Sequence, residues 1–316
     1  MPFDILTFGE ALVEIVRPGI DQPLDAPGTF EGPFPSGAPF IFTVQAARLG
    51  ANAACIGCVG DDAFGYCQLD QLRADGVTTD VVRVLPDYTT GVAFVAYAGD
   101  GSRDFLFHMR QAASGQLSPD LLDESWFEGL RLLHISGSTL AMHDDALALG
   151  HKALEMALAA GAKISFDLNI RPQLLSFERA RDIYAPFLDS ADVILATIEE
   201  ALRLTGASNL QIAAEALLDG RAGRIVIIHN GARGCTVHKA SGVEFAQPFE
   251  VEEIDPTGAG DCFDAGFLVR WLEGAAPVEA ASFANACGAL AVTARGPMAG
   301  AKARSEVETV LKRGEI

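Results

Sequence analysis

The sequence of 316 residues is poor in basic side chains, with 23 lysines and arginines against 42 aspartates and glutamates. The resulting formal net charge of -19 repels phosphate backbones and anionic lipid. We therefore expect neither nucleic acid nor a membrane surface as a partner. An anionic ligand would have to be held by local positive features, because the overall field opposes it.

Long hydrophobic runs and metal-binding cysteine clusters are also missing. No uninterrupted apolar stretch is long enough to span a bilayer, and the start Met-Pro-Phe-Asp has neither the basic region nor the apolar stretch of a secretory leader. Of six cysteines, Cys55 and Cys58 form a C-x-x-C, but no second pair or histidine cluster completes a zinc site. We expect both to lie in a buried strand, with reduced thiols in the cytoplasm.

Two common nucleotide-binding motifs are absent. A nicotinamide-dependent dehydrogenase needs G-x-G-x-x-G after its first strand, but here the first apolar run is followed by Gly9-Glu10-Ala11. A P-loop kinase needs G-x-x-x-x-G-K-[ST], and no Gly-Lys dipeptide occurs anywhere in the chain. The sequence therefore excludes both classes.

Short apolar runs dominate the first third of the chain, which we predict to consist of strands. Residues 17–36 are rich in Pro and Gly and form one exposed excursion, and residues 90–109 form a second. The second contains a hairpin with its turn at Gly99-Asp100-Gly101-Ser102. We expect these lid segments, near 10–36 and 90–110, to pair as a small β lid.

From about residue 130, short apolar runs alternate with helical stretches, a pattern typical of a doubly wound, mostly parallel α/β sheet flanked by helices. The predicted strands are 130–135, 163–166, 192–196 and 224–228. The predicted helices are about 144–160, 177–189 and 198–220, and most of 258–312. No repeat or clean linker interrupts the chain, so residues 1–316 are predicted to form a single domain.

The segment most informative about function is 255–267, Asp-Pro-Thr-Gly-Ala-Gly-Asp-Cys-Phe-Asp-Ala-Gly-Phe. Gly258 and Gly260 let the backbone turn tightly and approach a ligand. The spacing of the aromatic residues that follow predicts a helix starting here, whose free N–H groups and dipole form an anion site. Asp261 lies beside that site, either as a base that takes a proton from an attacking hydroxyl or as a helix cap.

This whole string resembles the C-terminal signature of the ribokinase-like (PfkB) carbohydrate kinases. The resemblance implies that Asp261 is the catalytic base and that the amides of Gly258, Ala259 and Gly260 form an anion hole for the transferred phosphate. It extends over nearly the full chain. Further matching segments are 8–12, 35–39 with 47–50, 57–65, 167–172, and 284–286 with residue 289.

The resemblance implies a ribokinase-like fold with ATP and Mg²⁺ as cofactors. It places ATP contacts at Thr197, His229, Gly231, Gly234, Thr257, Asn285 and Ala289. It places substrate contacts at Gly37, Asn169 and Asp261. Glu200 would hold magnesium through water, although an acidic residue early in a helix also complements the helix dipole.

Arg110 and Arg171 are further candidates for substrate recognition, chosen on physical grounds. Arg110 follows the lid hairpin and Arg171 follows an apolar strand. Ligands of α/β sheets bind at the carboxyl ends of strands, and a guanidinium suits a sugar-acid carboxylate or a row of hydroxyls. A surface ion pair is the alternative for each.

Four positions depart from the family pattern and bear on the substrate. Ser36 replaces one of two glycines, Ile41 replaces a sugar-binding asparagine, and Glu14 stands where many members carry an aspartate that grips the sugar. Thr197 replaces an asparagine, and a hydroxyl there is also seen in keto-deoxygluconate kinases. The segment 167–172 resembles one that is frequent in 2-keto-3-deoxygluconate kinases and fructokinases.

We predict an ATP-dependent sugar kinase that phosphorylates a primary hydroxyl. The substrate expected first is 2-keto-3-deoxygluconate, then a ketohexose (fructose or tagatose), then ribose and last a nucleoside. A sugar or nucleotide sensor that kept the fold is the non-enzymatic alternative. Lids in this family often pair across a two-fold axis, and exposed sheet edges invite pairing, so a homodimer through the lid is expected.

Overall fold

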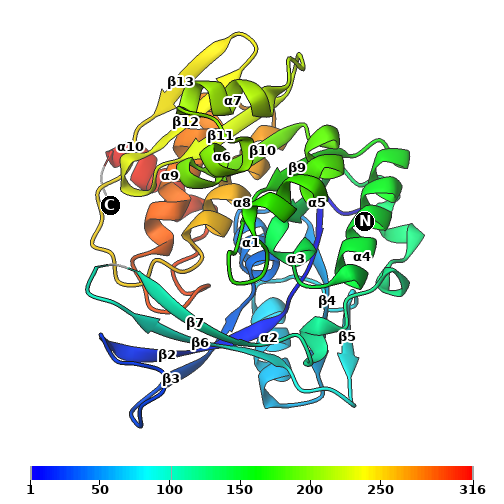
Figure 1. Cartoon of the computed structure of the whole chain (residues 1–316), viewed down its shortest axis with the longest axis vertical. Coiled ribbons are helices and arrows are strands. Elements are labelled where there is room, and N and C mark those ends of the chain that lie inside the picture. Colours follow the sequence, from blue (N-terminus) through cyan, green and yellow to red (C-terminus); the bar gives the residue numbers. More distant parts are fainter. Residues whose placement is uncertain (1, 101, 315–316) are drawn as a thin grey trace.

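The computed structural model describes residues 2–100 and 102–314, which form two sheets and the helices around them (Figure 1). The large sheet has the strand order β13-β12-β11-β10-β9-β8-β1-β4-β5, and the small sheet has the order β3-β2-β6-β7. The strands are β1 (Ile5–Phe8), β2 (Leu12–Ile20), β3 (Glu31–Ser36), β4 (Ala53–Gly60), β5 (Val82–Leu85), β6 (Gly91–Tyr97), β7 (Arg103–His108), β8 (Leu132–Ser136), β9 (Lys163–Asp167), β10 (Val193–Thr197), β11 (Ile225–His229), β12 (Cys235–Lys239) and β13 (Gly242–Ala246). The α-helices are α1 (Ala38–Arg48), α2 (Ala63–Ala74), α3 (Gly137–Leu140), α4 (Asp144–Ala159), α5 (Phe177–Ser190), α6 (Ile198–Thr205), α7 (Leu210–Leu218), α8 (Ala259–Leu272), α9 (Pro277–Ala291) and α10 (Arg304–Arg313).

The large sheet is parallel from β5 to β11 and ends in the antiparallel hairpin of β12 and β13. Parallel strands are covered on both faces, which is why they are apolar throughout rather than alternating. Every residue of β4 is buried, including the free thiols of Cys55 and Cys58. The predicted doubly wound α/β fold is therefore confirmed.

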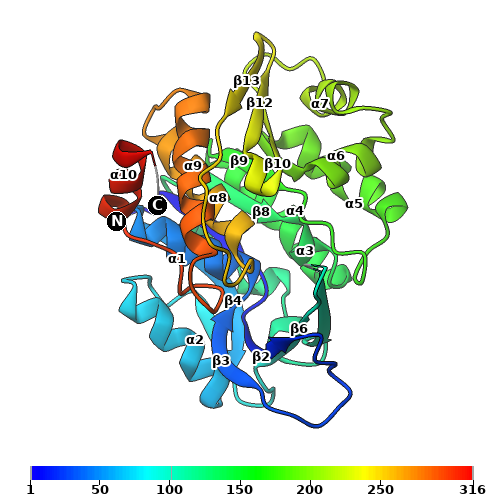
Figure 2. The same ribbon diagram turned by 90° about the vertical axis from the view of Figure 1, so that its left-hand side faces the viewer.

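Helices cover both faces of the large sheet (Figure 2). Helices α1, α8, α9 and α10 share one apolar core, and α1 packs directly against α8. Helices α4 to α7 belong to the core on the other face. None of the helices among the described residues has the length and apolar character needed to cross a membrane. The layers leave the carboxyl ends of the parallel strands facing the small sheet.

The prediction that the first third consists of strands is wrong for α1 and α2. Residues Pro39 to Gln45 of α1 are all buried, because the helix lies between the large sheet and α8. A helix enclosed on all sides needs no polar face, and its Phe, Ile, Thr and Val residues suit strands equally well. The apolar residues of this segment therefore show no helical period of 3.6 residues.

The predicted helix 198–220 is two helices, α6 and α7. Gly206 ends α6 in the left-handed conformation (φ 70°), and the side chain of Asn209 accepts a hydrogen bond from the Ile212 amide at the start of α7. Both are ordinary stop and start signals. The apolar residues before and after residues 206–209 follow a similar helical pattern, so the sequence was interpreted as one helix.

The two lid segments pair as predicted, because β2 of the first lies parallel to β6 of the second. The predicted hairpin is formed by β6 and β7, although Gly101 of its turn lies outside the described residues. Two side-chain contacts tie the small sheet to the segment before α8. The Tyr97 hydroxyl donates to Asp255 (2.9 Å), and Arg103 donates to the Thr257 hydroxyl (3.1 Å).

Candidate active site

Three neighbouring parallel strands end at the same edge of the large sheet with polar side chains. Asp167 ends β9, Thr197 ends β10 and His229 ends β11, and the strand register places Thr197 beside His229. Glu10 follows β1 on the same edge. Open α/β sheets bind their ligands at this position, so the topology itself indicates where a site belongs.

Helix α8 begins at this edge, as predicted, and its start is open. Gly258 precedes the helix in the left-handed conformation (φ 84°), and a Cβ there would lie 2.5 Å from the Pro297 carbonyl oxygen. No side chain caps the first turn. The free amides of the first turn and the helix dipole therefore remain available for an anion.

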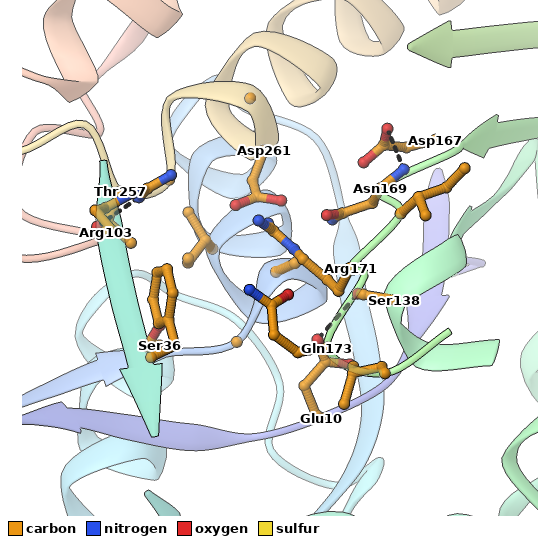
Figure 3. Close-up of a pocket in the computed structure, with 18 of the residues that line it drawn as sticks. Glu10, Ser36, Arg103, Ser138, Asp167, Asn169, Arg171, Gln173, Thr257 and Asp261 are labelled. Atoms are coloured by element: carbon orange, nitrogen blue, oxygen red, sulfur yellow. Dashed lines mark hydrogen bonds between the residues drawn. The ribbon is translucent and has the colours of Figure 1, made fainter. Parts of the chain in front are cut away.

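A cavity of about 530 Å³ lies between this edge and the small sheet (Figure 3). Gly258, Gly260 and Asp261 line it from α8, and Arg103, Phe105 and Phe107 line it from β7. A Cβ built on Gly260 meets no atom within 4 Å. The backbone of the first turn is therefore open to the cavity at Gly260, and a ligand can approach it there.

Asp261 lies on the first turn of α8 and borders the cavity, with the Arg171 side chain extending toward it (Figure 3). Burial raises the pKa of Asp261 to about 7, the Arg171 charge lowers it, and the negative charge of Glu10 raises it. A carboxyl with a pKa near neutrality can both accept and release a proton at physiological pH, which is what general-base catalysis needs.

Further carboxyl groups border the cavity near Asp261. Burial, together with the charges of Glu200 and Asp261, raises the pKa of both Asp167 and Asp264 well above the ordinary value. Asp264 Oδ1 lies 3.4 Å from His229 Nε2. Burial lowers the pKa of His229 to about 4, so this imidazole is neutral at physiological pH.

Glu200 is anchored by backbone contacts at the start of α6. Its Oε2 accepts from the Thr197 amide and hydroxyl (both 2.8 Å), and the Thr197 hydroxyl accepts from the Glu200 amide. Its Oε1 accepts from the Ile170 amide (2.7 Å). These reciprocal contacts form a capping box, which fixes Glu200 at the cavity edge. The capping box depends on the Thr197 hydroxyl.

The end of the cavity near the small sheet carries two buried carboxyl groups. Glu10 accepts hydrogen bonds from the hydroxyls of Ser138 (3.2 Å) and Thr139 (2.7 Å), and burial raises its pKa. Glu14 on β2 accepts from the Ser36 hydroxyl (2.7 Å), and burial raises its pKa to about 7. This end therefore offers mainly hydrogen-bond acceptors.

Most of the predicted site residues border this one cavity. They are Gly37, Asn169, Arg171, Thr197, Glu200, His229, Thr257, Gly258, Gly260 and Asp261. Ala259 lies between the two lining glycines. Arg110 is not brought into the cavity: it is exposed after β7, and its charge acts on His143 at the start of α4.

The remaining predicted ATP residues gather at a second place, around the end of β13. Asn285 on α9 donates to the carbonyls of Ala246 (3.1 Å) and Gln247 (2.9 Å). A Cβ on Gly234 would lie 2.4 Å from the same Ala246 oxygen. Gly231 begins the turn of residues 231–233 that precedes Gly234, and Ala289 lies one turn beyond Asn285. None of these four is among the described residues that line the cavity.

The candidate residues did not include several that line the cavity. They are Glu10, Arg103, Asp167, Gln173 and Asp264, and the cavity is also lined by Glu14 and Ser36, which were named above only as departures from the family pattern. The sequence spacing could have indicated two of these residues. Asp264 follows Asp261 by three positions, which places both on one helix face, and Arg103 alternates with Phe105 and Phe107 on one face of a strand.

Comparison with known proteins decides the family. The sequence pattern of the pfkB family carbohydrate kinases matches residues 8–304. The chain belongs to this family. This confirms the resemblance drawn from the motif at 255–267, and with it the prediction of a phosphotransferase that acts on a sugar hydroxyl.

Individual relatives agree over almost the whole chain. Probable fructokinase-4 of Arabidopsis thaliana is 32% identical over 317 residues, covering 98% of this chain and 96% of that protein. Fructokinase of Xylella fastidiosa with bound ATP superposes with a TM-score of 0.85 at 29% identity, covering 98% of this chain and 99% of that one. A candidate ribokinase II of E. coli in complex with ATP and Mg²⁺ superposes with a TM-score of 0.92 at 40% identity, with the same coverage.

Proposed function

We propose that this pfkB kinase transfers the γ-phosphoryl group of ATP to the primary hydroxyl of a ketohexose, with fructose as the first candidate. The observation that supports the reaction is the position of Asp261, which borders the cavity beside the open start of α8. Burial raises the pKa of this carboxyl group to about 7. The names of the relatives carry the choice of sugar, since the relatives from Arabidopsis thaliana and Xylella fastidiosa named above are called fructokinases. Fructose therefore takes precedence over 2-keto-3-deoxygluconate.

In the proposed reaction the sugar hydroxyl lies between Asp261 and the γ-phosphate. Asp261 takes the hydroxyl proton as the oxygen attacks phosphorus in line, which general-base catalysis typically accelerates by about 10²–10⁴-fold. The amides of Gly258, Ala259 and Gly260 are the anion hole for the charge on the transferring group. No side chain competes for these amides, because the first turn of α8 is uncapped.

A magnesium ion fits the acidic side of the cavity. Asp264 Oδ1 is buried and has no hydrogen-bond partner among the described residues, and Asp167 and Glu200 border the same cavity. Carboxylate oxygens suit Mg²⁺, which usually keeps several waters and binds nucleotide phosphates. Within residues 2–100 and 102–314, no group of three acidic, histidine or cysteine side chains is close enough to hold a metal alone. Asp264 and Glu200 would therefore hold it together with water and ATP, where it supplies charge neutralisation.

The small-sheet end of the cavity supports a neutral polyol as the acceptor. Glu10 and Glu14 supply carboxyl oxygens, and one Glu14 oxygen is buried without a partner among the described residues. Sugar hydroxyls donate to such oxygens, whereas a sugar acid would bring its negative charge next to two buried carboxyl groups whose own ionisation is already disfavoured. The acceptors thus favour fructose or tagatose.

A specific observation keeps the sugar acid as second candidate. Arg171 and Arg103 both border the cavity, and a guanidinium pairs well with a carboxylate. The deciding experiment is an ADP-release assay with MgATP and fructose, tagatose, 2-keto-3-deoxygluconate, ribose or adenosine. Higher kcat/KM for a ketohexose supports the proposal. Preference for the sugar acid overturns the choice of fructose. If the protein binds ATP but releases no ADP with any of these acceptors, it is a sensor.

Activity should fall on the acid side of neutrality. Because burial raises the pKa of Asp261 to about 7, the base is increasingly protonated below that pH, and kcat should drop about tenfold per pH unit there. The measurement is kcat against pH from 5 to 9 with saturating sugar and ATP. A profile that stays flat down to about pH 5 contradicts an Asp261 base with this pKa.

Replacing Arg171 with alanine should raise the sugar KM about tenfold or more, because hydrogen bonds to charged groups are worth about 1.5–3 kcal/mol. It should also move the acid limb of the pH profile to higher pH, since the Arg171 charge lowers the pKa of Asp261. Arg110→Ala is the matched control, because Arg110 is exposed outside the cavity. If Arg171→Ala changes neither quantity, Arg171 has no role in the site.

We also propose a homodimer through the small sheet. Leu106 and Ile20 are 48% and 61% exposed, and Leu106 alternates with cavity-lining neighbours on β7, so it faces away from the cavity. Light scattering should give about twice the mass of 33.3 kDa, and Leu106→Asp should reduce it to the monomer. A wild-type monomer at micromolar concentration contradicts the proposal.

A further inference from the structure

Ser36, the last residue of β3, joins three elements beside the sugar end of the cavity. Its hydroxyl donates to Glu14 Oε1 on β2 (2.7 Å), and its backbone amide donates to Gln68 Oε1 on α2 (3.2 Å). The three residues are 2%, 4% and 0% exposed, respectively. Ser36 is thus held by Gln68 from one side and holds Glu14 on the other.

Glu14 is left with one free oxygen. Its Oε2 is buried and has no hydrogen-bond partner in the part of the chain that the structure describes, and both Glu14 and Ser36 line the cavity. A buried acceptor without a partner is costly, so such an atom is expected to be satisfied by a ligand. The ligand that enters this cavity carries several hydroxyl donors if the proposed function holds.

We propose that Ser36 is a positioning residue for sugar recognition: by occupying one oxygen of Glu14, its hydroxyl directs the other to accept a hydrogen bond from a substrate hydroxyl. This inference rests on the proposed function, since it needs a polyol substrate. Gln68 acts one step further back, by fixing the Ser36 backbone.

The charges around Glu14 make the role of Ser36 measurable. Burial raises the pKa of Glu14 to about 7, and the Ser36 hydrogen bond lowers it. Arg103 of β7 also lowers it, whereas Asp255 and Asp261 raise it. A further titratable neighbour is the Tyr97 hydroxyl of β6, which Glu14 influences in turn. Removing the Ser36 hydroxyl should therefore move the pKa of Glu14 above 7.

A change in the pKa of Glu14 should change how the sugar KM depends on pH. An ionised carboxylate accepts a stronger hydrogen bond than a neutral carboxyl, so the sugar KM should rise as the pH falls through about 7. In Ser36→Gly the rise should begin at a higher pH. A purely structural role for Ser36 would change stability without moving this midpoint.

The variants are Ser36→Gly, which removes the hydroxyl, and Ser36→Thr, which keeps it. At pH 7.5 we expect Ser36→Gly to raise the fructose KM about tenfold with kcat and the ATP KM little changed, and Ser36→Thr to restore most of the affinity. Ser165→Ala is the matched control, because Ser165 is equally buried but hydrogen-bonds His134. It should leave the sugar KM unchanged.

A second measurement needs no turnover. The Glu14 carboxyl carbon can be followed by NMR titration in protein labelled with ¹³C-glutamate, with Glu14→Gln for assignment. We expect a higher pKa in Ser36→Gly than in the wild type, and equal values overturn the inference. Turnover of fructose with an unchanged KM in Ser36→Gly overturns the inference alone, whereas a wild type that phosphorylates no polyol overturns the proposed function as well.

Discussion

Asp261→Asn should lower kcat by about 10²–10⁴-fold while leaving the dissociation constant for ATP nearly unchanged. Asparagine has the same shape but cannot accept the hydroxyl proton. It also removes a buried carboxyl whose pKa is raised to about 7, so the variant should be at least as stable as the wild type. The measurements are steady-state kinetics, calorimetric ATP binding and the unfolding temperature.

Asp189→Asn is a suitable control, because it makes the same chemical change at a side chain that is 73% exposed. It should leave kcat and ATP binding unchanged. Near wild-type turnover in Asp261→Asn would show that another group, or a phosphate oxygen, accepts the proton. Loss of ATP binding together with turnover would instead place Asp261 in nucleotide binding.

Gly260→Ala should lower kcat/KM by about 100-fold without lowering the free energy of unfolding. A Cβ at residue 260 meets no protein atom within 4 Å, so the fold tolerates it, and alanine is the better helix former by about 1 kcal/mol. The added methyl group fills the gap through which a phosphate would approach the amides. Losing one such donor typically costs about 10²–10³-fold in rate.

Gly258→Ala separates the effect on the fold from the effect on the site. Residue 258 has a φ of 84°, and its Cβ would lie 2.5 Å from the Pro297 oxygen, so this variant should lose stability by about 1–2 kcal/mol or more. Chemical denaturation of both variants tests the contrast. Full activity in Gly260→Ala would mean that the transferred phosphate does not approach this turn.

The sequence predicted the elements whose signals are local. The strand runs of the second half, the start of α8 and the 90–110 hairpin were all found, because apolar runs and glycine turns mark them directly. Asp261, the proposed base, was singled out by its neighbours in the chain: the glycines and the following aromatic residues indicate a helix start, and the resemblance of the whole string to the PfkB signature implied the role of base. Pairing of the two lid segments was expected, but the parallel arrangement of β2 and β6 was not.

The sequence predicted less where the answer depends on packing. Helix α1 is enclosed on all sides and so lacked a helical period. Arg110 and Arg103 both lie close to one hairpin, but only strand alternation decides which faces the cavity, and it selects Arg103. Glu14 and Ser36 lie 22 positions apart, and their hydrogen bond depends on the register between β2 and β3.

The packing of α8 against α1 has a consequence for synthesis of the chain. The acidic lining residues Glu10, Glu14, Asp167 and Glu200 are made before β11 is complete. Asp264, the proposed base Asp261 and the proposed anion-hole amides come only with α8 and its start, and Pro297, which lies against Gly258, follows later still. We therefore expect a nascent chain on the ribosome to be inactive until nearly all of it has emerged. Until then the apolar face that α8 covers stays open to solvent, and we expect this stage to be the one at which chaperones bind.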